Sequence, residues 1–203
     1  MDRAPIDFWF DFISPFGYVA SLRIDDIAAR HGREVRWHPI LIGVTVLKVM
    51  GLRPLMSTPL KGDYIAREFE RYCRKHGLRL ARSIRDPLMD PLPVQRAFAW
   101  LIEHASEHAL PFARAALHAH WHDGVALDVE AAIHAAGSAA GVPHETMREA
   151  TSDPRASPLL RAEVEGAIAR GVFGSPYFII DGEPFFGADK LEEIDAWLRS
   201  GGW

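Results

Sequence analysis

The stretch from Ile6 to Ala20 limits what this 203-residue chain can fold into more than any other part of the sequence. Its first half alternates, so that Ile6, Phe8, Phe10 and Phe12 fall on one side of an extended chain and Asp7, Trp9 and Asp11 fall on the other. That period of two predicts a buried strand. Pro15 then suits the first position of a helix, because it lacks an N–H group and its φ angle is preset. Ser14 is therefore the predicted N-cap, and its hydroxyl should lie at the positive end of the helix.

The later segments define the order of the elements. After one helix of about four turns, residues 34–40 alternate again, which predicts a right-handed βαβ unit with two parallel strands. Only helical patterns occur from about residue 44 to residue 171. Strand character returns at residues 175–180, Asp181-Gly182 is a hairpin signal, and residues 183–186 form the return strand. Asp189 is expected to cap the final helix. We therefore expect an α/β domain of residues 1–43 and 172–203, with an all-helical insertion at residues 44–171.

Composition excludes several classes of protein. The net charge of −4 argues against a nucleic-acid surface, which needs clustered Lys and Arg. No run approaches the roughly 20 apolar residues that a membrane helix needs, and no signal-peptide pattern precedes the first strand, so a cytoplasmic protein is expected. Cys73 is the only cysteine, so no disulfide can form within the chain. Any thiol chemistry must use a thiol from another molecule.

The segment Phe-Asp-Phe-Ile-Ser-Pro-Phe-Gly-Tyr at residues 10–18 resembles the opening of the 2-hydroxychromene-2-carboxylate isomerases and the kappa-class glutathione transferases. These belong to the DsbA-like branch of the thioredoxin fold, and the resemblance implies a thioredoxin-like domain with an all-helical insertion. Thiol oxidoreductases of that fold begin the helix with Cys-x-x-Cys, where this chain has Ser14 and Gly17. The isomerases commonly have a second Ser at the position of Gly17.

Two C-terminal motifs extend the resemblance to the binding of reduced glutathione. The Ser175–Pro176 bond corresponds to the cis-proline of thioredoxin-like proteins, and the backbone of Ser175 would pair with the cysteinyl part of the tripeptide. The segment containing Ala188 and Asp189 resembles the one that holds the γ-glutamyl end. Asp189 would pair with the γ-glutamyl ammonium, although a helix cap explains the same residue.

The helical region carries a further match. Residues 51–54 and 59–64 resemble a kappa-class pattern in which Lys61 would face the glycine carboxylate of glutathione or an acidic substrate. Leu52 stands where the family has Asn, which removes a polar contact. Arg96 matches a family arginine less closely. Phe16, Leu52 and Arg96 are the predicted lining of a substrate pocket.

A histidine cluster needs a separate interpretation. On a helix, His118 and His122 share a face at i, i+4, while His120 does not. Two imidazoles without a clear third ligand make a weak metal site, so an exposed cluster and no metal are expected.

These observations lead to one main functional prediction and two alternatives. The main prediction is a glutathione-dependent cis-trans isomerase that acts on 2-hydroxychromene-2-carboxylate or a related aromatic pyruvate, with Ser14 as the catalytic residue that donates to the thiolate. The resemblance also implies a homodimer. The first alternative is a kappa-like transferase that conjugates glutathione to an electrophile. The second is a non-catalytic module that binds a thiol or peptide in the same cleft.

Overall fold

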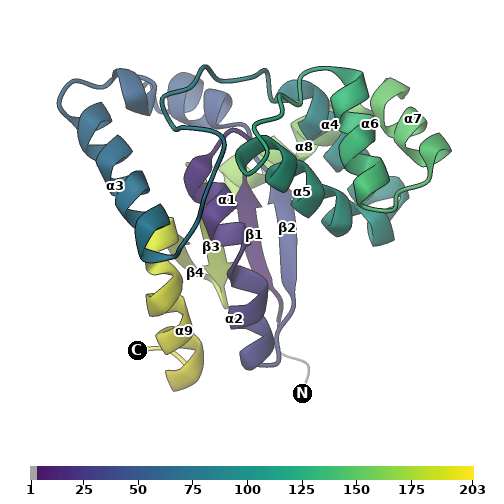
Figure 1. The fold of residues 1–203 in the computed structure, drawn as a ribbon. Coiled ribbons are helices and arrows are strands. Elements are labelled where there is room, and N and C mark those ends of the chain that lie inside the picture. Colours follow the sequence, from purple (N-terminus) through teal and green to yellow (C-terminus); the bar gives the residue numbers. More distant parts are fainter. Residues whose placement is uncertain (1–3) are drawn as a thin grey trace.

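The computed structural model describes residues 4–203, and a four-stranded sheet lies at its centre (Figure 1). The strands are β1 (Ile6–Phe10), β2 (Val35–Pro39), β3 (Tyr177–Ile180) and β4 (Glu183–Phe186), in the order β2-β1-β3-β4. β1 is parallel to β2, whereas β3 is antiparallel to both β1 and β4. β1 and β2 therefore end at the same end of the sheet at which β3 begins, which we call the sheet edge. The loops after β1 and β2 and the loop before β3 meet there.

The helices follow the predicted order. They are α1 (Pro15–Ser21), α2 (Ile24–Arg30), the π-helical η1 (Gly43–Val49), the 3₁₀ turn η2 (Leu55–Ser57), α3 (Lys61–Lys75), α4 (Leu92–His104), α5 (Ser106–Trp121), α6 (Glu130–Ala139), α7 (His144–Ser152), α8 (Ala156–Ala169), the 3₁₀ turn η3 (Ala188–Lys190) and α9 (Leu191–Ser200). Within the described residues, every element between β2 and β3 is helical, as the sequence predicts. None of the described helices is long and apolar enough to cross a membrane.

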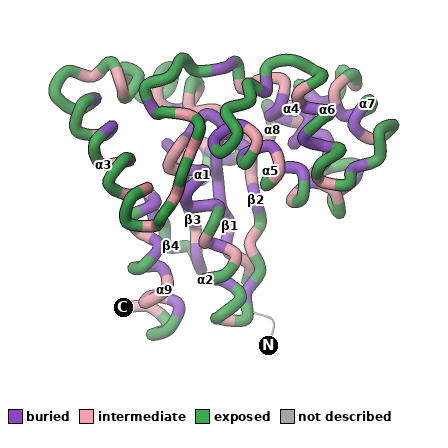
Figure 2. Tube along the Cα trace, in the orientation of Figure 1, coloured by how far each residue is buried: buried purple, intermediate pink, exposed green. Residues whose placement is uncertain are grey.

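Helices cover both faces of the sheet. α1, α2 and α9 lie over one face, where α2 packs against β2 and α9. α8 lies on the other face, where Ala167 joins a small apolar cluster with Trp9 and Tyr177. The two central strands, β1 and β3, are mostly buried, whereas β4 and the outer face of α3 are mostly exposed (Figure 2).

The prediction of one continuous helix after β1 is wrong, because the segment forms two short helices. Arg23 lies between them with φ −130° and ψ −26°, outside the helical region. The Ser21 hydroxyl donates to the Tyr18 carbonyl over 2.7 Å, a local bond that competes with regular helix geometry. α1 is consequently only seven residues long.

The core continues from the sheet into the helical region. The Phe10 and Phe98 rings have centroids 5.4 Å apart, which joins β1 to α4. Trp121 Nε1 of α5 donates to the Phe12 carbonyl over 2.9 Å. The helices of the insertion thus pack directly on the end of β1 and fix the loop that carries Ser14.

Candidate functional site

Ser14 and Ser175, which are 161 residues apart in the sequence, meet at the edge where β1 ends and β3 begins. Ser14 Oγ accepts a hydrogen bond from the Gly17 N–H over 3.0 Å, which confirms the predicted N-cap. The same hydroxyl donates to the Ser175 carbonyl over 3.0 Å. The bond from Ser175 to Pro176 is cis, as predicted. The structure therefore brings the first two predicted motifs into direct contact.

Ser175 has two donors without partners. Its Oγ accepts from the Asp11 N–H over 3.0 Å. Among the described residues, no group accepts a hydrogen bond from the Ser175 N–H or from the Ser175 hydroxyl. Ser175 is half-buried, whereas the Ser14 side chain is buried. The Ser175 N–H and hydroxyl can consequently serve a molecule bound at this edge.

Asp11 is a buried carboxyl group beneath this pair, and sequence reasoning missed it. It accepts from the Ile13 N–H (3.2 Å), the Ile42 N–H (2.9 Å) and the Gln95 side-chain amide (3.2 Å). Burial raises the pKa of Asp11 to about 6, even though these three hydrogen bonds favour the charged form. Asp11 thereby ties the Ser14 loop, the start of the insertion and α4 together.

Gln95 was missed for a related reason. It lies among apolar residues on α4, and its side chain donates both to Asp11 and to the Ile40 carbonyl over 2.9 Å. A glutamine on the buried face of a helix needs such partners. That signal was present in the sequence, but its partner lies 84 residues away.

Gly17 leaves space that other residues use. A Cβ atom built on Gly17 would lie 2.6 Å from Ser175 Oγ and 3.2 Å from Ser14 Cβ. No side chain fits at position 17 unless the Ser175 hydroxyl moves. The Ser175 hydroxyl therefore occupies space that is open only because residue 17 is a glycine.

Ala188 and Asp189 lie in η3, which packs against α1. Ala188 is buried and Asp189 is exposed. The prediction that Asp189 caps the last helix is wrong, because the N-cap of α9 is Lys190 and no side chain caps it. The cause is the 3₁₀ turn, which follows Gly187 at φ 113° and places Asp189 ahead of the helix. The Asp189 carboxylate is consequently free of the capping role.

Lys61 is the first residue of α3 and is exposed. It bears no ion pair among the described residues. Its neighbour Gly62 has a packing role, because a Cβ on Gly62 would lie 2.5 Å from the Met56 carbonyl oxygen. Leu52, in the loop before η2, is 53% exposed. The close approach of Gly62 to the Met56 backbone thus fixes the start of α3, where Lys61 lies, whereas Leu52 lies on the surface.

Phe16 connects α1 to α3 through its ring, which lies 5.3 Å from that of Phe69. Phe69 also lines a cavity of about 480 Å³ whose wall includes Cys73 and the arginines Arg74, Arg79 and Arg82. From the sequence, Arg79, Arg82 and Arg85 are interpreted as solvated loop charges, whereas Arg74 belongs to α3. The structure places Arg74, Arg79 and Arg82 beside an aromatic wall, a combination that suits an aromatic acid.

Arg96 lies elsewhere. From α4 it lines a second cavity of about 380 Å³, together with Asp128 in the loop before α6, Glu130 on α6 and Asp153 in the loop before α8. No hydrogen bond or ion pair within the described residues joins Arg96 to the Ser14 region. Gln95, its neighbour on α4, is the residue that faces the site.

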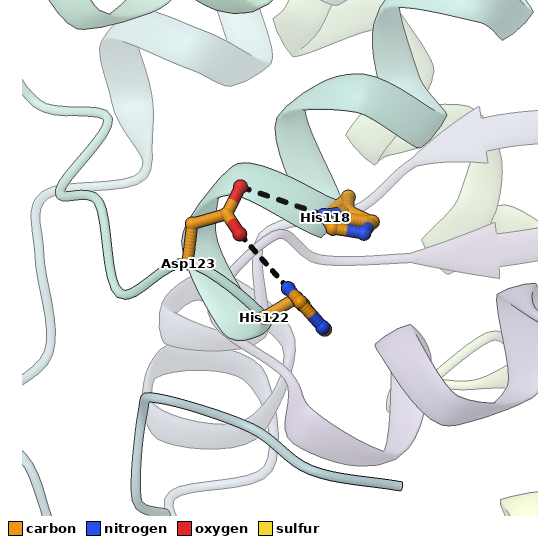
Figure 3. A group of neighbouring side chains, drawn as sticks. All are labelled: His118, His122 and Asp123. Atoms are coloured by element: carbon orange, nitrogen blue, oxygen red, sulfur yellow. Dashed lines mark hydrogen bonds and ion pairs between the residues drawn. The ribbon is translucent and has the colours of Figure 1, made fainter.

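The histidine cluster lies at the end of α5 (Figure 3). His118 Nδ1 and His122 Nδ1 lie 3.5 Å and 2.8 Å from the two carboxylate oxygens of Asp123. Asp123 is a possible third ligand that sequence reasoning missed, because it follows the helix. All three side chains are half exposed, and the carboxylate already pairs with both imidazoles, so we still propose no metal there.

Comparisons with known proteins were made for the whole chain. The profile of the DSBA-like thioredoxin domain matches residues 5–199. The 2-hydroxychromene-2-carboxylate isomerase of Sphingobium xenophagum is 27% identical over 201 residues, covering 95% of this chain and 97% of that protein. The protein of the same description from Pseudomonas putida is 24% identical, covering 94% and 92%.

Solved structures agree with the architecture. A 2-hydroxychromene-2-carboxylate isomerase matches with a TM-score of 0.80 at 22% identity, covering 96% of this chain and 94% of that chain. The cytosolic disulfide reductase DsbM from Pseudomonas aeruginosa with GSH matches with a TM-score of 0.66 at 15% identity, covering 97% and 98%.

Proposed function

Because the chain belongs to the DSBA-like thioredoxin domain family, we propose that it is a glutathione-dependent isomerase of 2-hydroxychromene-2-carboxylate or a related aromatic pyruvate. Relatives described as such isomerases span almost the whole chain at 24% and 27% identity. The observation that carries the proposal is the contact of Ser14 with Ser175, because it places a hydroxyl beside a peptide N–H that has no partner among the described residues, in a protein without a redox pair of cysteines.

The residues at the sheet edge fit reduced glutathione. The Ser175 N–H has no partner among the described residues, and an extended peptide can accept from it as an added strand would. A peptide N–H can replace Ser14 as the donor to the Ser175 carbonyl. The Ser14 hydroxyl would then be available to donate a hydrogen bond to the sulfur atom. When bound, glutathione supplies the thiolate that adds to the substrate double bond, permits rotation about the resulting single bond and leaves unchanged.

Magnitudes support a hydroxyl as the main stabiliser of that thiolate. Lowering a thiol pKa from ≈ 8.5 by about two units requires ~2.7 kcal/mol. The terminus of a helix as short as α1 contributes ~0.3–1 kcal/mol when exposed. A hydrogen bond to a charged group contributes ~1.5–3 kcal/mol. Hydroxyl donors at the site must therefore supply most of the effect.

Charged residues would hold the ends of the ligands. Asp189 is exposed on the turn beside α1, where it can pair with the γ-glutamyl ammonium, and Ala188 would contribute backbone contacts. Lys61 is exposed and unpaired among the described residues, so it can face a carboxylate. Phe16 would contact the aromatic substrate, and Phe69, whose ring lies beside that of Phe16, lines the first cavity. Leu52 remains our weaker candidate for the substrate pocket, and Arg96 would contribute only through the second cavity that it lines.

The proposal extends to the state of the protein. We propose a cytoplasmic homodimer with domains at residues 1–43 plus 172–203 and at residues 44–171. Exposed apolar residues before α3, including Val49, Met50 and Leu60, offer a surface for a second copy. Light scattering after gel filtration tests the dimer, since a monomer mass would contradict it.

The decisive experiment compares Ser14→Ala with Ser21→Ala. Both remove a buried hydroxyl at an end of α1, from the N-cap in Ser14→Ala and from the last helical residue in Ser21→Ala, but among the described residues the Ser21 hydroxyl bonds only to the Tyr18 carbonyl. Isomerisation of 2-hydroxychromene-2-carboxylate should require glutathione and should fall by about 10- to 100-fold in Ser14→Ala, because a charge-assisted hydrogen bond is lost. Ser21→Ala should retain the activity. Equal rates with and without glutathione would refute the proposal.

Product mass separates isomerisation from conjugation, because an adduct gains the tripeptide and an isomer does not. A disulfide reductase activity is not proposed. Cys73 has no second cysteine to pair with, and burial raises the pKa of its thiol.

A further inference from the structure

The geometry points to the Ser175 hydroxyl as a second hydrogen-bond donor to the sulfur of bound glutathione, a role for the side chain in addition to the backbone. This inference rests on the proposed function. It concerns which hydroxyl proton stabilises the thiolate, and it starts from the different hydrogen bonds that the Ser14 and Ser175 hydroxyl groups make.

The Ser14 hydroxyl both accepts and donates a hydrogen bond within the chain. It accepts from the Gly17 N–H and donates to the Ser175 carbonyl, each over 3.0 Å. Ser14 can donate to a sulfur atom only after another donor takes over the Ser175 carbonyl. Its hydrogen bond to the ligand therefore depends on the ligand peptide being correctly seated.

The Ser175 hydroxyl accepts a hydrogen bond but donates none among the described residues. It accepts from the Asp11 N–H over 3.0 Å, so its oxygen is fixed by the end of β1. No group among the described residues accepts its proton. Ser175 is also less buried than Ser14. A fixed oxygen with an uncommitted proton beside the Ser14 hydroxyl is a preorganised donor for an anion.

Gly17 makes this arrangement possible. Its missing Cβ would stand 2.6 Å from Ser175 Oγ, so the hydroxyl occupies space that a side chain at position 17 would take. Moving the hydroxyl from residue 175 to residue 17 should consequently return a donor to nearly the same place. The chain thus offers its own rescue experiment.

The experiment measures the thiol pKa of glutathione bound to the protein, from the ultraviolet absorbance of the thiolate as pH is raised. In Ser175→Ala we expect the bound thiol pKa to rise by about one unit, from about 6.5 to about 7.5, which is a loss of about threefold in thiolate at pH 7 and of about tenfold well below both pKa values. The double variant Gly17→Ser with Ser175→Ala should restore most of the shift. Gly17→Ala with Ser175→Ala is the matched control and should not restore it.

The outcomes separate this inference from the proposed function. If the wild type neither binds glutathione in calorimetry nor lowers its thiol pKa, the proposed function fails, and this inference fails with it. If the wild type lowers the pKa and Ser175→Ala lowers it equally, only the Ser175 role is overturned. The role is also overturned if Gly17→Ser fails to restore the pKa while the double variant still binds the tripeptide. Should Ser175→Ala not fold, Ser175→Thr, which keeps the hydroxyl, should retain the low pKa, and a raised pKa in that variant would overturn the role.

Discussion

The sheet edge that carries Ser14 and the segment that leads into α3 are both predicted to bind parts of one ligand, yet they are built differently. At the sheet edge, Ser14, Ser175 and Asp11 are joined by hydrogen bonds that span up to 164 residues of sequence. In the segment at residues 50–62, which we call the entry segment, the bonds are local, such as Gly62 N–H to the Thr58 carbonyl over 2.9 Å.

Exposure follows the same division. Asp11 is fully buried, whereas Leu60 in the entry segment is 94% exposed with φ at 65°. A non-glycine residue at that φ is held by its surroundings at some cost. From this comparison we expect the reaction to take place at the sheet edge, which long-range hydrogen bonds make rigid. We expect the ends of the ligand to be recognised in the entry segment, where the hydrogen bonds are local. Substitutions in the two regions should therefore differ in kind and in size.

The largest effect should come from Asp11→Ala. The variant leaves three donors without an acceptor, and each unsatisfied buried group costs ~1–3 kcal/mol, so unfolding free energy should fall by more than about 3 kcal/mol. Leu52→Ala in the entry segment should change it by less than about 0.5 kcal/mol, as surface substitutions usually do. Urea unfolding of both variants measures this difference. Similar values for the two would remove the distinction between the regions.

The second effect concerns pH. Burial raises the pKa of Asp11 to about 6 in the folded protein, above its ordinary value near 3.9 in the unfolded chain. The folded state therefore holds the proton more tightly, and the resulting stabilisation is present below about pH 4 and is lost as pH rises through about 6. A rise of that size corresponds to about 3 kcal/mol at most.

Comparison with Asp11→Asn isolates this contribution. The amide has no charge to titrate, so the fall in unfolding free energy between about pH 4 and about pH 6 should be smaller in the variant than in the wild type. Urea unfolding at a series of pH values gives both curves. Parallel curves would show that Asp11 does not titrate in this range.

The two regions also differ in what sequence reasoning could predict. The N-cap at Ser14, the cis bond before Pro176 and the hairpin at Asp181-Gly182 were all predictable, because each depends on a local motif or on the family resemblance. The break between α1 and α2 was not, because no local pattern marks Arg23 as the residue that leaves the helical region.

Long-range partners were the main omission. The Asp11–Gln95 bond joins residues 84 apart, and no local pattern pairs them. The placement of Asp189 failed for a local reason, since the 3₁₀ turn after Gly187 moves the N-cap of α9 by one residue, from Asp189 to Lys190. The sequence therefore allowed candidate site residues to be proposed, but it could not predict the hydrogen-bond network around Ser14 and Ser175.

The third effect tests the backbone contact in the entry segment. A Cβ at position 62 would lie 2.5 Å from the Met56 carbonyl oxygen, so Gly62→Ala should lower unfolding free energy by about 1–3 kcal/mol, as overpacking does. Gly166→Ala in α8 is the matched control, because nothing lies within 4 Å of its Cβ. Alanine there should stabilise the protein by about 0.5–1 kcal/mol. Thermal unfolding that gives both variants the same sign would contradict the predicted contact.

The smallest effect should come from Lys61→Met. Its ammonium group is exposed and has no acidic partner among the described residues, so it is available to a carboxylate, but exposed ion pairs contribute only ~0.2–1 kcal/mol. We expect the glutathione Kd or the substrate KM to rise by about 2- to 5-fold with little change in kcat. Arg67→Met, which removes an exposed cation from the same helix, should leave both constants unchanged. Because salt screens exposed charges, added salt should narrow the gap between wild type and Lys61→Met. A large fall in kcat would instead assign Lys61 to the reacting centre, and the division of roles between the sheet edge and the entry segment would no longer hold.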